Sequence, residues 1–264
     1  NYIGTIGYTQ KDYKGRELDF LSINCTNSIL ADKNVRKALN YAINKQKIVS
    51  SVYGNNYTIS NFPLDYGSYL YTKSSDKDSY NQDKAKKALE EAGWTYRYGR
   101  WQKTENYSTK TLRLSIVVDN SNKQRVKVAE IIEKQLEDIG IRISIYKVSN
   151  KNYKSYLNER NYDLILTGIN NGYSPDLSYF LDNGNIGNYE NEEIKSIMTD
   201  LKNTTDEEAV KQKYNRIVEI YEEDMPYICL YRNKGKTVYS MKLYGEFNPN
   251  NYTSYYNLSK WYRQ

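Results

Sequence analysis

Residues 32–49 read Asp-Lys-Asn-Val-Arg-Lys-Ala-Leu-Asn-Tyr-Ala-Ile-Asn-Lys-Gln-Lys-Ile-Val. Asp32 is a typical helix cap, because its carboxylate can accept a backbone N–H of the first turn. The apolar residues recur at helical spacing and share one face: Val35, Ala38, Leu39, Ala42 and Ile43. The basic residues lie off that face. The stretch therefore predicts a half-buried helix, followed after Asn44 by a second, shorter helix that ends at Gly54.

Outward from this stretch, the chain alternates between helix-like and strand-like segments. Helical spacing predicts further helices, at residues 81–93, 126–140, 152–160, 191–202 and 206–224. Apolar or alternating runs predict strands, at residues 18–24, 112–118, 141–145, 163–167 and 227–231. Residues 112–145 form a strand, a crossover helix and a parallel strand, which should be right-handed. Residues 55–79 predict a loop, and residues 236–264 show only short strand signals. The pattern indicates the α/β class.

The composition limits the possible functions. The chain has 264 residues, 39% of them hydrophobic, which is enough for a sizeable core in one or two domains, and no apolar run is long enough to span a membrane. Its 38 basic and 32 acidic residues give a net charge of +6. Lysines stand next to glutamates along the predicted helices, as at residues 84–91, which is typical of solvated faces. We therefore expect no nucleic-acid partner.

The sequence contains no histidine. This excludes nucleophile systems in which an imidazole takes the proton, and it excludes histidine zinc sites. Neither a phosphate-binding loop nor a paired-glycine dinucleotide loop is present. We therefore expect no cofactor, no metal site and no enzymatic activity. A hydrolase that uses two carboxylates stays open as an alternative, because the 32 acidic residues allow many pairings and no local motif marks one.

Five segments, in order along the chain, carry a family resemblance. The first is the 32–49 stretch. The others are Asp83-Lys-Ala-Lys-Lys-Ala-Leu-Glu-Glu-Ala-Gly-Trp94, Ile132-Glu-Lys-Gln-Leu-Glu-Asp-Ile-Gly-Ile141, Tyr162-Asp-Leu-Ile-Leu-Thr-Gly168 and Glu223-Asp-Met-Pro-Tyr-Ile-Cys-Leu-Tyr231. Together they resemble the oligopeptide- and dipeptide-binding proteins, family 5 of the extracellular solute-binding proteins, which serve ABC importers. The resemblance covers residues 18–264.

The resemblance implies a two-lobed, periplasmic-binding-protein-like fold of class II (cluster C), whose lobes close on the ligand. Residues 31–225 would form the second lobe, a mixed sheet flanked by helices. Residues 1–30 and 226–264 would hold the two crossing strands and remnants of the first lobe. Family members are longer and exported, so we expect a C-terminal portion of a longer protein. The opening residues carry no signal peptide, so a leader would belong to the preceding part.

The resemblance also implies a function without catalysis. The protein would bind peptides between its lobes and deliver them to ABC permease subunits, as a monomer. We expect an extracytoplasmic location, lipid-anchored on the outer face of the membrane in a Gram-positive bacterium and periplasmic in a Gram-negative one. The same fold serves other ligands, so a signalling peptide, a sugar or a chelated metal stays open as an alternative.

The loop after the 163–167 strand is the expected ligand contact, because ligands lie beyond the carboxyl ends of parallel strands. The family usually places a tryptophan and an amine-binding aspartate at positions where this chain has Ile169 and Gly172. Capture of a free peptide N-terminus by this loop is therefore not expected. Three polar side chains can still bind a peptide backbone: Asn170, Asn171 and Tyr173. Plain loop chemistry, with Asp176 as a helix cap, would also explain the composition.

Two further residues match ligand positions of the family. Tyr153 stands where relatives often have an aromatic side chain that faces the ligand, and Arg160 where oligopeptide binders have an arginine. The structural alternatives are a tyrosine that packs its helix onto the sheet and an arginine that suits the end of a helix.

Cys25 and Cys229 lie on the two expected crossing strands. An even number of cysteines in an exported protein permits a disulfide. Two separate buried thiols are the alternative, which we favour, because free cysteine behaves as a small hydrophobic residue.

Overall fold

The computed structural model describes residues 4–64, 68–70, 79–172 and 174–263. Its main sheet has six strands in the order β2-β9-β1-β8-β6-β7. Their bounds are Tyr57–Ile59 for β2, Tyr227–Ser240 for β9, Tyr8–Ile23 for β1, Leu164–Asn170 for β8, Arg113–Asp119 for β6 and Arg142–Val148 for β7. β6 runs parallel to β7 and β8, whereas β1 is antiparallel to β8 and β9. The fold is therefore α/β with a mixed sheet.

Helices cover both faces of this sheet. One face carries α1 (Lys33–Ala42), α2 (Lys45–Val52), α3 (Gln82–Glu91) and α4 (Lys123–Glu137). The other carries α5 (Asn150–Glu159), α6 (Ser178–Leu181), α7 (Glu192–Leu201) and α8 (Glu207–Asp224). The predicted helices are confirmed, with ends that differ by a few residues. Asp32 caps α1 as predicted, because its carboxylate accepts the N–H of Asn34 at 2.8 Å.

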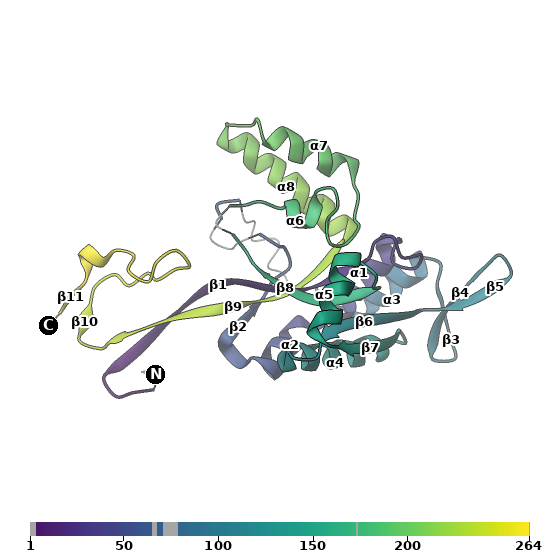
Figure 1. Cartoon of the computed structure of the whole chain (residues 1–264), viewed down its shortest axis with the longest axis horizontal. Helices are drawn as coiled ribbons and strands as arrows, with labels where there is room; N and C mark the ends of the chain where they lie inside the picture. Colours follow the sequence, from purple (N-terminus) through teal and green to yellow (C-terminus); the bar gives the residue numbers. More distant parts are fainter. Residues whose placement is uncertain (1–3, 65–67, 71–78, 173, 264) are drawn as a thin grey trace.

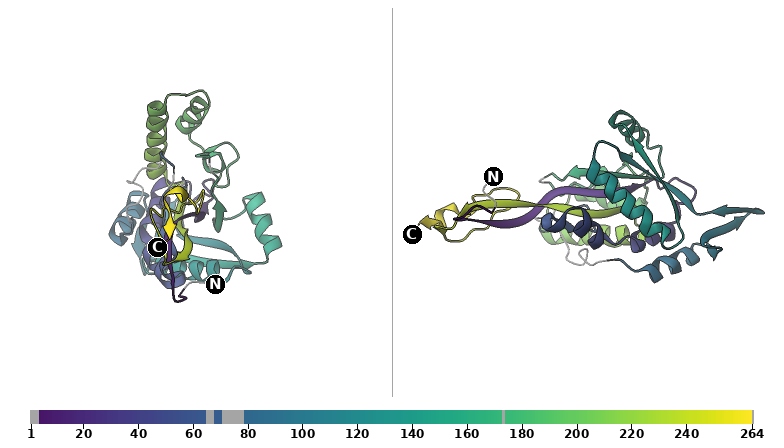
Figure 2. Two further views of the ribbon diagram at one scale, coloured as in Figure 1. Left: turned by 90° about the vertical axis from the view of Figure 1, so that its left-hand side faces the viewer. Right: turned by 90° about the horizontal axis from the view of Figure 1, so that it is seen from below.

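Strands β1 and β9 are much longer than predicted. Their inner halves cross the sheet, and their outer halves form a two-stranded ribbon that projects from the body of the molecule (Figures 1 and 2). The prediction of short strands was wrong because the outer residues are mostly polar and show no buried face. The register shifts between Lys14 and Leu18, where Gly15 lies against Asn233. A Cβ at Gly15 would come within 1.9 Å of Asn233 Oδ1, so only glycine fits there.

The predicted loop at residues 55–79 contains a short 3₁₀ turn at Gly54–Asn56 and strand β2. Residues 65–67 and 71–78 of that loop lie outside the described residues. The end of the chain carries two short strands at the tip of the ribbon, β10 (Leu243–Tyr244) and β11 (Tyr262–Arg263), with a 3₁₀ turn at Leu258–Lys260 (Figure 1). No helix of the described residues has the length and apolarity needed to cross a membrane.

A separate three-stranded sheet was not predicted. It consists of β3 (Thr95–Arg97), β4 (Arg100–Glu105) and β5 (Ser108–Thr111), and it extends from the body on the side away from the β1–β9 ribbon (Figures 1 and 2). Its strands are short and largely exposed, so they give no alternation of apolar and polar residues. Trp101 holds the sheet to the core: it is buried, and its indole N–H donates to Ile139 O at 2.8 Å.

Candidate ligand-binding site

A cavity of about 340 Å³ lies at the carboxyl end of β8. We call it the β8 pocket. Ten residues from β8, the loop after it, α6 and the 60–64 segment line it: Pro63, Leu64, Ile169, Asn170, Asn171, Gly172, Ser174, Asp176, Tyr179 and Phe180. Ile169 and Asn170 belong to β8 itself, so the prediction that the loop begins at Gly168 was wrong. Pairing with β1 continues to Glu17 and Asn170, and this pairing holds the strand extended.

Asn171 joins the loop after β8 to the opposite wall of the pocket. Its backbone N–H donates to Arg16 O at 3.0 Å, and its side-chain Nδ2 donates to Pro63 O at 2.7 Å. Its Oδ1 is buried and has no hydrogen-bond partner among the described residues. An unsatisfied buried acceptor costs about 1–3 kcal/mol, which a donor from a ligand would recover. Asn171 Oδ1 is therefore the polar atom of the pocket that we most expect to accept a hydrogen bond from a ligand.

Gly172 leaves space in the pocket. Its φ lies outside the left-handed region, and among the described residues a Cβ placed on it would meet only Ser174 N, at 3.9 Å. The position can therefore take a side chain. Asp176 is exposed at the pocket, and its Oδ1 accepts the N–H of Ser178 at 2.8 Å. Its carboxylate thus bonds the first residue of α6, but Leu177 holds the cap position, so the prediction of Asp176 as the cap was wrong.

The other predicted ligand residues lie apart from this pocket. Tyr153 is buried between α5 and the sheet, its hydroxyl donates to Leu166 O at 3.0 Å, and burial raises its pKa. Arg160 ends α5 in the left-handed region, with φ of 54°, and donates to Gly184 O and Asn188 Oδ1. Tyr153 thus packs α5 onto the sheet, the alternative named for it, whereas the Arg160 guanidinium bonds the 184–188 segment. Tyr173 lies outside the described residues.

A partly buried polar cluster on the opposite face of β8 was not predicted. Arg125, in the first turn of α4, donates to both oxygens of Asp19 on β1, from Nε at 2.9 Å and from Nη2 at 2.6 Å. The Tyr231 hydroxyl donates to Asp19 Oδ2 at 3.1 Å and lies 3.0 Å from the Tyr53 hydroxyl. Burial raises the pKa of Tyr53 to about 12. Gly168 faces the cluster, and no single motif links its members in the sequence.

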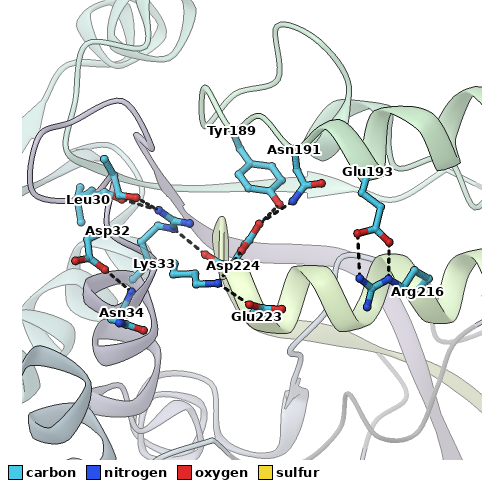
Figure 3. A network of polar contacts seen from close by, with 12 residues as sticks. Leu30, Asp32, Lys33, Asn34, Tyr189, Asn191, Glu193, Arg216, Glu223 and Asp224 are labelled. Carbon is cyan, nitrogen blue, oxygen red and sulfur yellow. Dashed lines mark hydrogen bonds and ion pairs between the residues drawn. The ribbon is translucent and has the colours of Figure 1, made fainter. Parts of the chain in front are cut away.

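A second, larger cavity of about 590 Å³ lies where α1 meets the end of α8. Figure 3 shows the network beside it: Asp224 Oδ2 accepts bonds from the Tyr189 hydroxyl at 2.6 Å and from Asn191 Nδ2 at 3.0 Å. Arg36, buried nearby, donates to Asp224 O, Leu30 O and Ala31 O, each at 2.8 Å. These groups bind one another and hold the two helices together, so we do not assign the ligand to this cavity.

Both cysteines of the chain are free thiols. Cys229 is fully buried beside the Tyr221 hydroxyl, whereas Cys25 is partly exposed. Burial raises the pKa of the Cys25 thiol to about 11. Within the described residues, no group of three or more cysteine, aspartate or glutamate side chains could hold a metal ion.

Comparison with known proteins gives the family. The model of the bacterial extracellular solute-binding proteins, family 5 (middle), matches residues 3–191. The oligopeptide-binding protein AppA of Bacillus subtilis is 28% identical over 254 residues, which are 92% of this chain and 46% of AppA. Heme-binding protein A of Haemophilus influenzae is 26% identical over 258 residues, 94% of this chain and 45% of that protein.

Solved structures of solute-binding proteins share the fold of this chain. The structure of Bacillus subtilis AppA in complex with a nonapeptide matches with a TM-score of 0.77 and 25% identity, over 98% of this chain and 53% of that chain. The structure of NikZ from Campylobacter jejuni in complex with Ni(L-His) matches with a TM-score of 0.77, but at 22% identity it shows only the fold. This chain spans about half the length of these relatives. On the match over residues 3–191, the chain belongs to family 5 of the bacterial extracellular solute-binding proteins.

Proposed function

We propose that this chain is the ligand-binding second lobe of an extracytoplasmic receptor that delivers peptides to an ABC permease. The observation that carries the proposal is the β8 pocket, which brings together Ile169, Asn170, Asn171 and Gly172 at the carboxyl end of a parallel strand. The likeness to AppA, whose structure holds a nonapeptide, supports a peptide as the ligand. Because the named relatives are binding proteins, we propose no catalytic step.

The chemistry of the β8 pocket suits a peptide backbone. An extended peptide offers N–H donors, and Asn171 Oδ1 is a buried acceptor that lacks one. Asn170, which is exposed at the pocket, has both donors and acceptors to offer. Ile169 and Phe180 give the pocket an apolar wall for a ligand side chain. Tyr153 and Arg160 were also predicted to contact the ligand. Their polar atoms bond other parts of the chain, so the β8 pocket does not support that role and it stays a prediction.

The proposed domain organisation is residues 31–225 as the second lobe, with residues 1–30 and 226–264 as crossing strands and parts of the first lobe. The β1–β9 ribbon supports it, because the ribbon leaves the body and ends in exposed aromatic side chains. These include Tyr244, Tyr255 and Tyr262, which are 41%, 68% and 56% exposed. A first lobe from the same protein would cover this surface and close the other side of the ligand site.

The remaining parts of the proposal concern location and ligand range. A monomeric receptor outside the cytoplasmic membrane fits the family, and a lipid anchor stays a prediction. A non-peptide solute is the second candidate ligand, because heme-binding protein A is nearly as similar to this chain as AppA is.

Mass spectrometry of ligand that co-purifies with the longer protein containing this chain would test the proposal. We expect peptides, and calorimetry should show that they bind without being cleaved. In that protein Asn171→Ala should weaken peptide binding about 10-fold, the loss expected for one buried hydrogen bond. Asn158→Ala, on the exposed face of α5, is the control and should leave binding unchanged. Co-purified heme or sugar, or full peptide affinity in the Asn171 variant, would contradict the proposal.

A further inference from the structure

Four arginines gather at the base of the β3–β5 sheet. Arg97 lies directly opposite Arg100 across the β3–β4 hairpin, and Arg113 lies beside Arg142 in the parallel β6–β7 pair. The two pairs are adjacent, because Leu112 N–H donates to Trp101 O at 2.9 Å and Arg142 N–H donates to Leu112 O at 3.2 Å. One continuous strip of backbone thus carries all four.

The four side chains share one face of this strip. Trp101, Leu112, Ile141 and Ile143 are all buried in the core under α3 and α4. Side chains alternate along strands, so Arg100, Arg113 and Arg142, each next to one of these residues, point to the other side. Arg97 faces the same way as Arg100, its cross-strand partner. All four arginines are exposed. We call this surface the arginine face.

The arginine face has no counter-charge within the described residues. None of its four guanidinium groups makes an ion pair or a side-chain hydrogen bond there. On the opposite side of the β3–β5 sheet, by contrast, Glu105 lies 3.0 Å from Lys103 and 3.5 Å from Lys110. Like charges directly opposite each other weaken a hairpin, so this arrangement gains nothing for the fold itself.

The turn that joins β3 to β4 carries a residue whose backbone conformation is unfavourable. Tyr98 is 92% exposed and has φ of 52°, in the left-handed region where tyrosine is unfavourable. Tyr107, in the next turn, is fully exposed with φ of 63°. Glycine or asparagine would serve these turns better. Unfavourable choices without an internal gain are typical of functional surfaces.

We propose that the arginine face and the Tyr98 turn form a docking surface for the phosphate headgroups of an anionic lipid bilayer. Guanidinium groups bind phosphate oxygens in pairs, and exposed tyrosine rings settle at the headgroup level of a bilayer. The β3–β5 sheet, whose β3–β4 turn carries Tyr98, projects from the body of the molecule (Figure 1). A soluble polyanion would use the arginines but gain less from the tyrosines. The proposal is independent of which ligand the β8 pocket binds.

Vesicle co-sedimentation of the 264-residue chain tests the proposal. We expect binding to vesicles that contain phosphatidylglycerol, little binding to phosphatidylcholine alone, and weakening by salt. Arg97→Gln with Arg100→Gln, or Arg113→Gln with Arg142→Gln, should lower the partition coefficient about 30-fold, since each surface basic residue contributes roughly a factor of five. Lys134→Gln with Lys202→Gln, two exposed lysines on α4 and just after α7, removes the same charge elsewhere and should lower the partition coefficient far less.

Tyr98→Asn distinguishes an effect on vesicle binding from an effect on stability. Asparagine tolerates the left-handed region, so the melting temperature should stay or rise while vesicle binding falls several-fold. Equal binding to neutral and anionic vesicles would overturn the proposal, as would equal losses in the lysine control pair. Competition by soluble polyphosphate or RNA at the same strength as anionic vesicles, with no effect of Tyr98→Asn, would show a general polyanion site and overturn it as well.

Discussion

At the scale of single residues, two glycines four positions apart have opposite requirements. Gly168 faces the Asp19–Arg125 pair: a Cβ there would come within 2.1 Å of Asp19 Oδ1 and 2.3 Å of Arg125 Nη2. Gly172 opens into the β8 pocket, where a Cβ meets nothing closer than 3.9 Å. The sequence alone could not separate them, because the Asp19–Arg125 pair joins residues that are far apart in the chain.

This difference gives a matched pair of variants. Gly168→Ala should lower the free energy of unfolding by about 1–3 kcal/mol, because the ion pair must shift to admit the methyl group. Gly172→Ala should change it by less than about 0.5 kcal/mol. Urea unfolding of the two variants measures both values. Equal stability of the two would mean that the Asp19–Arg125 pair does not lie against β8.

The open space at Gly172 also makes the ligand chemistry testable. The pocket offers a neutral buried acceptor, Asn171 Oδ1, and the carboxylate among the described lining residues, Asp176, is exposed and therefore a weak partner for an ammonium group. In the longer protein, acetylating a peptide ligand's N-terminus should thus change the affinity less than ~10-fold. Gly172→Asp should create a preference for free-amine peptides. Loss of binding on acetylation, together with the same loss in Asp176→Asn, would instead assign the amine to Asp176.

The Cys25 thiol should make the stability of the protein depend on pH. Burial raises the pKa of Cys25 from 9.0 to about 11, so the folded state holds the thiol proton more tightly than the unfolded state. The stability from this group is complete below pH 9 and falls as the pH rises from 9 to 11. Cys25→Ala should reduce the loss of stability over that range, measured by thermal unfolding. Unchanged pH dependence would place Cys25 in a more solvated site.

At the scale of elements, the sequence predicted what is decided locally. Helices such as α1 and α8 carry their own caps and apolar faces, and the buried strand β8 is a short apolar run. The outer half of the β1–β9 ribbon and the β3–β5 sheet could not be found this way, because exposed strands have no buried face to set a period of two. The candidate site divides in the same way. Its β8 side could be predicted from the direction of the parallel strands, whereas Pro63 and Phe180 reach the pocket only through tertiary packing.

One buried side chain, Arg36, bonds α1 to the end of α8, beside the exposed ion pair of Lys33 with Glu223. Arg36 is buried and satisfies three backbone carbonyls, including Asp224 O near the end of α8. Arg36→Met would keep the apolar stem but leave those acceptors without donors, so it should cost about 2–4 kcal/mol of stability. Lys37→Met, the neighbouring residue with no such bonds, is the control and should cost less than about 0.5 kcal/mol. Chemical denaturation of both variants would decide, and similar losses would argue against the role of Arg36.

At the scale of the whole molecule, two packed layers of helices on one mixed sheet account for residues 18–232, while the ribbon and its aromatic end extend beyond that core. The β8 pocket lies at the surface of this core, between the carboxyl end of β8, α6 and the 60–64 segment. A ligand bound there would keep much of its surface in water, whereas well-formed sites bury most of it. The described residues thus form a closed core, and in the two-lobe proposal the rest of the ligand site would come from the first lobe.

We expect the chain alone to fold stably but to bind its ligand weakly. The 264-residue chain should unfold cooperatively on heating, because its core closes without further segments. For peptides that the longer protein binds at micromolar affinity or better, the chain alone should bind at least ~100-fold more weakly, equivalent to about 2.8 kcal/mol of lost contacts. Calorimetry of both proteins with the same peptide gives the ratio, and a scrambled peptide controls for nonspecific binding. Equal affinities would mean that one lobe forms the whole site, and the two-lobe proposal would then be wrong.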